Sequence, residues 1–384
     1  MTARIAISAS ILTLLAACSG ATHTDLEDSV AGSADPTAPE PGGTPGAADP
    51  GGDPSGSGSG SKGGGSDGAC KLDEAAFDIP GNGKDDDCNG KVDDVDVCDG
   101  ALAIGATDAT DAAKALGVCK LGDAKGGGSW GVVSAKWLRL DGAPLPGGAG
   151  DAFGLLTKLG AAKPVAGSTM LALSSGVARG PGDPGYVDPA NGGKDRGWSS
   201  AILGGLKAAS SLCPTTMFGE AHDGVVLELA IRVPSNARSM SFTHQFFTPD
   251  YLDYVCSEYD DFFAVTMDPK PADRPDGNIT VDAAGDPISV NSTFIRACAA
   301  GSHANVAYSC PLGGDPLTGT GYQDHASTGW LTTSVGVAPG SLVTLRFAIW
   351  DSGDGEYDST ALVDGLTFSA SPVTTTTTVA NAAK

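Results

Sequence analysis

The stretch from Phe242 to Met267 places the strongest constraint on the fold of this chain. Two runs rich in aromatic and β-branched residues, Phe242–Phe247 and Phe262–Met267, flank an acidic segment that contains three tyrosines. Runs of this kind, separated by turn-forming residues, are typical of β-strands. The stretch therefore predicts two strands joined by an acidic, tyrosine-rich turn.

A second stretch repeats this arrangement a hundred residues downstream. In Leu342–Trp350 the apolar residues fall on one face of a period-two pattern, and the acidic turn Asp351–Ser359 and the strand-like run Leu362–Phe368 follow. Residues that alternate in this way line one face of a strand. Two strand pairs, each with carboxylates at one end, predict a β-sandwich with an ion-binding or recognition edge.

Further alternating runs support a mainly β fold. They span residues 132–140, 170–173, 225–233 and 331–337, and Asp108–Leu116 predicts one short helix with Asp108 or Thr110 as its N-cap. We expect an antiparallel β-sandwich, jelly-roll-like, with a short N-terminal helix and long loops. It would occupy residues 100–371, after a disordered tether and before a disordered threonine-rich tail over 372–384.

The N-terminal segment predicts export and anchoring. Residues 1–18 have a basic start and an apolar run too short to span a bilayer. Leu15–Cys18 resembles a bacterial lipobox, which implies a lipid on Cys18 and a place in the outer membrane, facing the periplasm or the cell surface; the alternative is an ordinary signal peptide with an incidental cysteine. Residues 19–69, rich in Gly, Ser and Pro, predict a disordered linker.

The charge of the chain limits its partners. The net charge is −23, and only seven of the 46 acidic residues are glutamates, so most carboxylates belong to aspartates, which favour turns. Nucleic acid is excluded as a partner because its binding depends on basic side chains that contact phosphates. Cations are the natural ligands of such a surface.

The cysteines indicate an oxidising compartment. Apart from Cys18 there are eight, an even number that predicts disulfides in an exported protein. Eight cysteines allow 105 pairings. Proximity in the sequence favours Cys298–Cys310, then Cys213–Cys256, and leaves Cys70–Cys88 and Cys98–Cys119. A zinc site is disfavoured because no C-x-x-C spacing occurs.

A calcium-loop pattern lies within an aspartate-dense module over residues 70–99. Alternate oxygen-bearing residues of a tight loop point inward together, which suits a cation that takes six to eight oxygen ligands. Gly90 occupies the sharp-turn position, and the alternative is a solvated acidic turn. The predicted ligands, with the carbonyl of Lys91 among them, are Asp85, Asp87, Asn89, Lys91, Asp93 and Asp96. The stretch from about residue 78 to 94 also resembles the metal-binding repeat of MopE type in bacterial surface proteins.

A second calcium site is predicted where the two acidic turns would meet. Crowded carboxylates repel one another, and a divalent cation relieves that repulsion. The predicted ligands are Asp253, Asp260, Asp261, Asp354 and Asp358. The alternative is that these aspartates cap turns while Tyr254, Tyr259 and Tyr357 brace the edge of the sandwich.

From about Asp108 to Phe368 the chain resembles the choice-of-anchor L domain, a bacterial surface module. The resemblance rests on four segments: residues 226–237, Phe242–Phe246, Asp253–Phe262, and Ile349–Ser359 with Val363 and Asp364. The chain departs from the family pattern at Thr248–Tyr251 and at Asp260. The resemblance implies a location and a fold rather than an activity.

Taken together, these patterns predict a cell-surface lipoprotein with a calcium-stabilised sandwich in a structural, adhesive or recognition role, with a surface protein or a glycan as ligand. No enzyme is expected, because no HExxH motif or nucleophile elbow occurs and His244 alternates with core phenylalanines. A carbohydrate-binding module is the first alternative and would expose Trp198, Tyr322 and Trp330 on one loop face. A glycoside hydrolase, with two opposed carboxylates in a cleft, is the second.

Overall fold

The computed structural model describes residues 70–201, 206 and 209–380. The predicted signal peptide, the lipid attachment at Cys18 and the linker over 19–69 lie outside these residues. No helix in the described part of the chain is both long enough and apolar enough to cross a membrane.

The described chain is mainly β, as the alternating runs predict. One short helix, α1 (Ala109–Ala115), begins after Asp108, whose side chain accepts a hydrogen bond from the Thr110 amide and so caps the helix. A single 3₁₀ turn, η1, spans Asp315–Leu317. The strands are β1 (Gly131–Leu138), β2 (Phe153–Leu156), β3 (Met170–Ser174), β4 (Ser199–Ser200), β5 (Ala221–Arg232), β6 (Ser239–Thr248), β7 (Phe262–Asp268), β8 (Ile288–Ser289), β9 (Gly301–His303), β10 (Val306–Tyr308), β11 (Ala326–Ser327), β12 (Leu331–Gly336), β13 (Leu342–Ser352), β14 (Thr360–Ser369) and β15 (Thr376–Val379).

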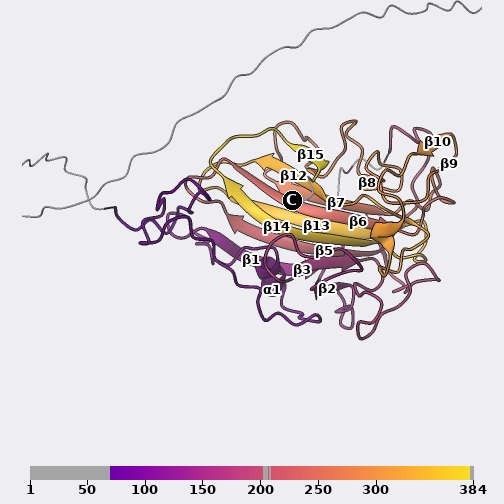
Figure 1. The fold of residues 1–384 in the computed structure, drawn as a ribbon, viewed down its shortest axis with the longest axis horizontal. Coiled ribbons are helices and arrows are strands. Elements are labelled where there is room, and N and C mark those ends of the chain that lie inside the picture. The colour runs from indigo at the N-terminus through magenta and orange to yellow at the C-terminus, as the bar shows by residue number, and fades with distance from the viewer. Residues whose placement is uncertain (1–69, 202–205, 207–208, 381–384) are drawn as a thin grey trace, which may run out of the picture. The chain divides into compact units, whose positions relative to one another are not determined.

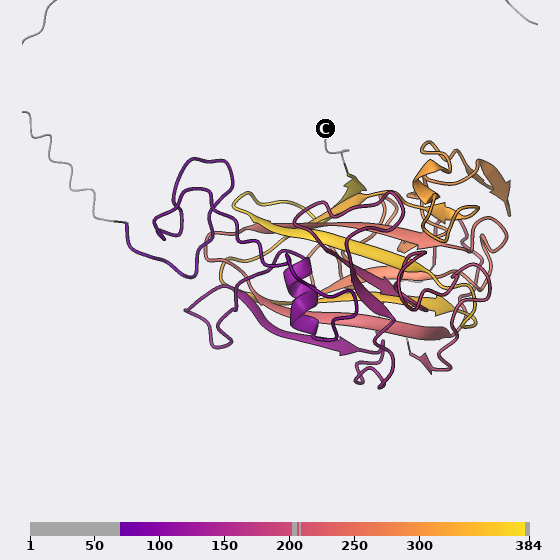
Figure 2. The ribbon, with the colours of Figure 1, turned by 60° about the horizontal axis from the view of Figure 1, so that its bottom comes forward.

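Two antiparallel sheets form the sandwich (Figure 1). The first has the order β1-β5-β13-β7-β8 with β4 beside β5, and the second the order β15-β12-β6-β14-β3-β2 with β11 beside β6. The consecutive strands β5, β6 and β7 alternate between the sheets, and so do β12, β13 and β14. Figure 2 shows the two sheets as layers, with α1 lying in front.

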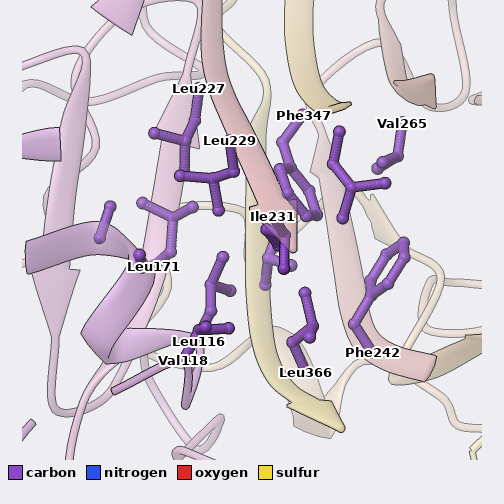
Figure 3. Packing of buried hydrophobic residues seen from close by; sticks show 14 of the residues in the cluster. Leu116, Val118, Leu171, Leu227, Leu229, Ile231, Phe242, Val265, Phe347 and Leu366 are labelled. Carbon is purple, nitrogen blue, oxygen red and sulfur yellow. The ribbon is translucent and has the colours of Figure 1, made fainter. Parts of the chain in front are cut away.

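The core lies between the two sheets because their inward faces are apolar. The ring of Phe242 on β6 meets that of Phe347 on β13 edge-on, with 5.4 Å between the centroids. Figure 3 shows Leu227, Leu229 and Ile231 of β5 with these rings in the same cluster. Burial of such side chains is the main stabilising contribution to a sandwich.

The aspartate-dense segment packs directly on the sandwich. Phe77 belongs to the main core, and its ring lies against those of Trp130 and Phe368. The side chain of Asn236 donates to the Phe77 carbonyl and accepts from the Phe77 amide. Residues 70–99 therefore share a core with the domain predicted for 100–371.

Part of the threonine-rich tail forms a strand, although disorder is predicted for 372–384. Thr376–Val379 forms β15 and pairs with Leu331–Ser334 of β12. Threonine is β-branched and favours strands when an open sheet edge is available. The tail prediction is therefore wrong for these residues.

All four expected disulfides form. They join Cys70 to Cys88, Cys98 to Cys119, Cys213 to Cys256, and Cys298 to Cys310. All eight cysteines lie outside the strands, and the Cys213–Cys256 loop encloses both β5 and β6.

Candidate functional site

The two acidic turns meet at one end of the sandwich. Strand β7 pairs with β13, and this pairing brings the turn before β7 next to the turn after β13. The Ser352 hydroxyl donates to the Glu258 carbonyl at 2.9 Å, which ties one turn to the other. The predicted convergence of the two hairpins is confirmed.

The turns enclose a cavity of about 200 Å³ with an acidic and aromatic lining. The Tyr254 ring lies 5.7 Å from that of Tyr259 and 5.8 Å from that of Tyr357, so one ring joins the two turns. All three tyrosines are half-buried, whereas Asp354 and Glu356 at the rim are exposed. We call this cavity the tyrosine pocket. Asp250, Asp261 and Ser352 complete its lining.

Behind the pocket, two aspartates follow the inward-facing apolar residues of β7 and β13. Phe347 pairs with Val265 and Ile349 with Phe263, so the next inward-facing pair is Asp351 with Asp261. Directly opposed residues of antiparallel strands have Cβ atoms about 5 Å apart. Both side chains are buried. Their burial and the charges around them raise the pKa of each well above the ordinary carboxyl value.

The two carboxylates differ in their hydrogen bonds. Asp261 accepts from the Ser359 hydroxyl at 2.7 Å and from the Ser352 amide at 3.3 Å. Asp351 lies close to Asp261 and to Ser175, yet neither of its oxygens has a hydrogen-bond partner of acceptable geometry among the described residues. A buried carboxylate without partners is strongly disfavoured.

Asp358 enters the same region from the turn before β14. Its Oδ2 accepts from the Lys194 amide at 2.8 Å, while its buried Oδ1 has no partner among the described residues. Burial raises the pKa of this side chain to about 7. A Cβ on Gly176 would lie 1.6 Å from Asp358 Oδ2 and one on Gly193 2.6 Å, so the fit of Asp358 requires glycine at both positions.

The basic side chains in this region are already engaged. The Arg196 guanidinium contacts Asp151 at 2.9 Å, and the Lys194 ammonium also pairs with Asp151. Arg196 additionally donates to the carbonyls of Ser175 and Gly176. These contacts hold the loop around Asp358 but leave Asp351 without a hydrogen-bonded cation.

The five residues predicted for a second calcium site occupy four different environments. Asp261 and Asp358 are buried beside Asp351, and Asp354 lies at the pocket rim. Asp253 is exposed. Asp260 faces away from the pocket, where it accepts from the Asn291 side-chain amide at 2.7 Å and from the Val290 amide.

The calcium-loop segment adopts the expected turns but gathers a different set of carboxylates. Asp85 accepts from the amides of Asn89 and Gly90, and Gly90 has a φ of 93°. Within the described chain, one group of three carboxylates has oxygens all within 4.8 Å of one another, and it consists of Asp78, Asp87 and Asp94. Of these, only Asp87 is among the predicted ligands.

The other predicted ligands of the loop lie outside this group. Asp93 accepts from the amides of Asn82 and Gly83, and Asp96 is exposed. The amide of Lys91 donates to the Asn89 side chain. The Lys120 ammonium lies 3.3 Å from Asp87 and 5.3 Å from the centre of the Trp130 ring, so a cation already borders the group.

Aromatic residues do not form the exposed face that a carbohydrate-binding module would present. Tyr322 is buried, and its hydroxyl donates to the Asp358 carbonyl at 3.0 Å and contacts the Thr360 hydroxyl. Trp330 packs against a core cluster, and Trp198 lies under Arg196. The exposed trio that would favour a carbohydrate-binding module is therefore not formed by these three residues, which support the loops instead.

Sequence reasoning missed Asp351, Asp250, Asp78 and Asp94. Asp351 continues the period-two row of Val343, Leu345, Phe347 and Ile349, and this continuation is a signal that it points inward. Asp250 joins the two ends of the first acidic turn, because its Oδ2 accepts from the Asp261 amide, and burial raises its pKa to about 7. For Asp78, seven residues before the loop, the sequence pattern carries no such signal.

Comparisons with known proteins identify one family. The family model of the choice-of-anchor L domain matches residues 173–369. No curated protein matches the chain. Two chains of solved structures match, and one is the K2 cleaved adhesin domain of Lys-gingipain, with 13% identity, coverage of 61% of this chain and 88% of that chain, and a TM-score of 0.24.

Proposed function

The chain belongs to the choice-of-anchor L domain family, and from that membership we propose that it is a cell-surface protein whose tyrosine pocket recognises another surface component. A lipid on Cys18 would hold it at the outer membrane, and the linker over 19–69 would carry the sandwich clear of the bilayer. The four disulfides support an extracytoplasmic location, because such bonds persist in oxidising compartments.

One observation carries the recognition role: two turns about a hundred residues apart in sequence build a single open cavity. The cavity combines three tyrosine rings with the exposed carboxylates of Asp354 and Glu356. Tyrosine and carboxylate side chains together favour a cationic group, through cation–π attraction and charge-assisted hydrogen bonds. The chain's net charge of −23 attracts the same class of ligand. We therefore propose a surface protein that presents a lysine or arginine side chain as the partner.

Calcium at the aspartate-rich segment belongs to the same proposal. Its ligands would be Asp78, Asp87 and Asp94, whose oxygens already lie together. The support is the turn geometry at Asp85 and Gly90, which resembles that of a calcium loop. The ion would displace the Lys120 ammonium from Asp87.

The test is a binding screen with the mature chain carrying Cys18→Ser, against arrays of basic peptides and of neutral glycans, in calcium and in chelator. We expect capture of arginine- or lysine-rich peptides, weakened about tenfold by Tyr357→Ala, the change that follows from losing roughly 1.4 kcal/mol of binding energy. Tyr186→Ala is the control, because Tyr186 is half-buried and lies outside the pocket.

Two results would contradict the proposal. Binding of basic peptides that Tyr357→Ala leaves intact would place recognition elsewhere on the molecule. Binding to neutral glycans alone, with loss on the same substitution, would favour the carbohydrate-binding alternative.

A further inference from the structure

The region behind the tyrosine pocket holds buried acceptors that the protein leaves without donors. Both oxygens of Asp351 and Oδ1 of Asp358 are buried and have no hydrogen-bond partner among the described residues. Asp351 is 1% exposed. Native proteins rarely leave such groups unsatisfied, because an isolated buried carboxylate costs several kcal/mol. These oxygens are therefore open to a ligand other than a protein donor.

The positions of these oxygens in the fold bring them together from both sheets. Asp261 and Asp351 each lie next to the last printed pair of β7 with β13, Phe262 with Trp350, in the first sheet. Asp358 immediately precedes Ser359, next to the start of β14 in the second sheet. The Ser359 hydroxyl donates to Asp261, and the Ser359 amide donates to Ser175 Oγ. Asp358 and Asp223 contribute to the raised pKa of Asp351, and a Cβ on Gly176, next to Ser175, would lie against Asp358.

The local basic residues do not account for the arrangement. Arg196 and Lys194 pair with Asp151 and approach Asp358, but no hydrogen bond from either reaches Asp351. A proton shared between Asp261 and Asp351 would satisfy only one of the three open oxygens. All three oxygens can coordinate one divalent cation, and calcium prefers ligand sets made only of oxygens, such as carboxylates and hydroxyls.

We propose that a calcium ion binds between Asp261, Asp351 and Asp358, and that it holds together the two turns that form the tyrosine pocket. The three carboxylates are less closely gathered than those of Asp78, Asp87 and Asp94, and the ion would draw them inward by cancelling their repulsion. Asp261 lines the pocket as well as this site. The inference rests on the proposed recognition function in one respect, namely that the ion prepares the pocket for its partner.

The experiment uses the mature chain with Cys18→Ser, in which Asp87→Asn and Asp94→Asn remove the ligands of the aspartate-rich segment. Thermal unfolding is recorded in chelator and with added calcium chloride. We expect calcium to raise Tm by about 5 °C at a hundredfold excess over Kd. Asp351→Asn should abolish that rise and, in chelator, should raise Tm, because a neutral amide avoids the cost of burying an ionisable side chain without partners.

A matched control separates this site from a general effect of buried charge. Asp364 is also buried, but its oxygens accept from the amides of Val165, Ala166 and Gly365. Asp364→Asn should keep the full calcium response. A parent that does not respond to calcium, or an Asp351→Asn variant that responds like its parent, would overturn the inference.

The same proteins distinguish this inference from the proposed function. If peptide capture depends on Tyr357 but not on calcium, the recognition function stands and the ion has no part in it. If calcium raises Tm through Asp351 while no partner binds, the cation site stands and the function of the pocket is wrong.

Discussion

His244 is a polar residue buried in the core of the sandwich. Its ring is fully buried between those of Phe242 and Phe263, and its Nε2 shares a hydrogen bond with the Thr333 hydroxyl at 2.9 Å. The sequence predicts this position from alternation alone, because His244 lies two residues from Phe242 and from Phe246. Burial lowers the pKa of His244 to about 3, so the folded protein holds the ring neutral.

This pKa predicts an acid-sensitive contribution to stability. The unfolded chain takes up a proton on His244 below its ordinary pKa of about 6.5, whereas the folded chain excludes that proton down to about pH 3. The stabilisation is therefore complete above pH 6.5 and is lost as the pH falls, by about 3 kcal/mol at pH 4. The free energy of unfolding in urea, measured at pH 7 and at pH 4, should lose this acid-sensitive part in His244→Gln. The control is His303→Gln, an exposed position, which should keep it. Equal acid sensitivity in His244→Gln and the parent would refute the assignment.

The individual aspartates are where prediction from sequence was least complete. Composition and turn signals identify Asp261, Asp354 and Asp358 as candidates, and the structure places them at or behind one pocket. The same signals cannot distinguish Asp260, which points to Asn291, from Asp261 beside it. Adjacent residues of an extended segment face opposite ways, so only the register of β7 on β13 decides between them.

At the scale of elements, long alternating strands are predictable and short edge elements are not. The runs in β5, β12, β13 and β14 appear in the sequence within a few residues of their observed ends. Strand β2 lies fully buried as Phe153–Leu156, too short for periodicity to reveal, and β15 exists because β12 offers it an edge. Such strands depend on a neighbour distant in sequence, which local patterns do not report.

Removal of β15 tests whether the tail is structural. A chain ending at residue 371 loses the pairing with β12 and the bond between the Thr333 and Thr377 hydroxyls. At roughly 1 kcal/mol for each hydrogen bond, we expect a loss of a few kcal/mol in the free energy of unfolding measured in urea. Removal of residues 381–384 alone is the control. Identical unfolding midpoints for the two truncated chains would show that β15 contributes nothing.

The Cys213–Cys256 bridge supports the first of the two acidic turns. It closes a loop with a sequence separation of 43, and the Cys256 amide donates to the Asn291 side chain. In the chain-entropy model its removal costs about 4 kcal/mol. The double substitution Cys213→Ala and Cys256→Ala should lower Tm and weaken peptide capture, because the turn that contains Tyr254 is no longer held by a covalent bond. Loss of stability without loss of capture would mean that the β7–β13 pairing alone positions the pocket.

At the scale of the whole molecule, the sequence predicts both the sandwich and its export, because amphipathic patterning and an apolar leader are local properties. The four pairings among the eight cysteines also follow from proximity in the sequence. The sequence does not predict that residues 70–99 pack on the sandwich, where Phe77 belongs to the common core. An aromatic residue in an aspartate-rich segment does not reveal which surface it packs against.

Anchoring is tested on the full chain in a bacterial host with an outer membrane. The unaltered chain should sediment with outer-membrane fractions, and Cys18→Ser should release it, because one lipidated cysteine is the proposed attachment. Cys70→Ser is the control, since it removes a cysteine that belongs to a disulfide. Sedimentation of the Cys18→Ser protein with membranes would rule out lipid attachment there.

The arrangement of the four bridges has a mechanical consequence for a tethered protein. Their loops follow one another along the chain without overlapping, and none of the eight cysteines lies within a strand. The Cys213–Cys256 loop contains β5 of the first sheet and β6 of the second. Tension applied along the backbone would therefore separate the other strands of the two layers while these two stay within one closed loop. The extension gained on unfolding is then shorter than the contour length of the whole chain, because the residues inside the closed loops do not extend. Single-molecule stretching of oxidised and reduced protein measures this difference directly.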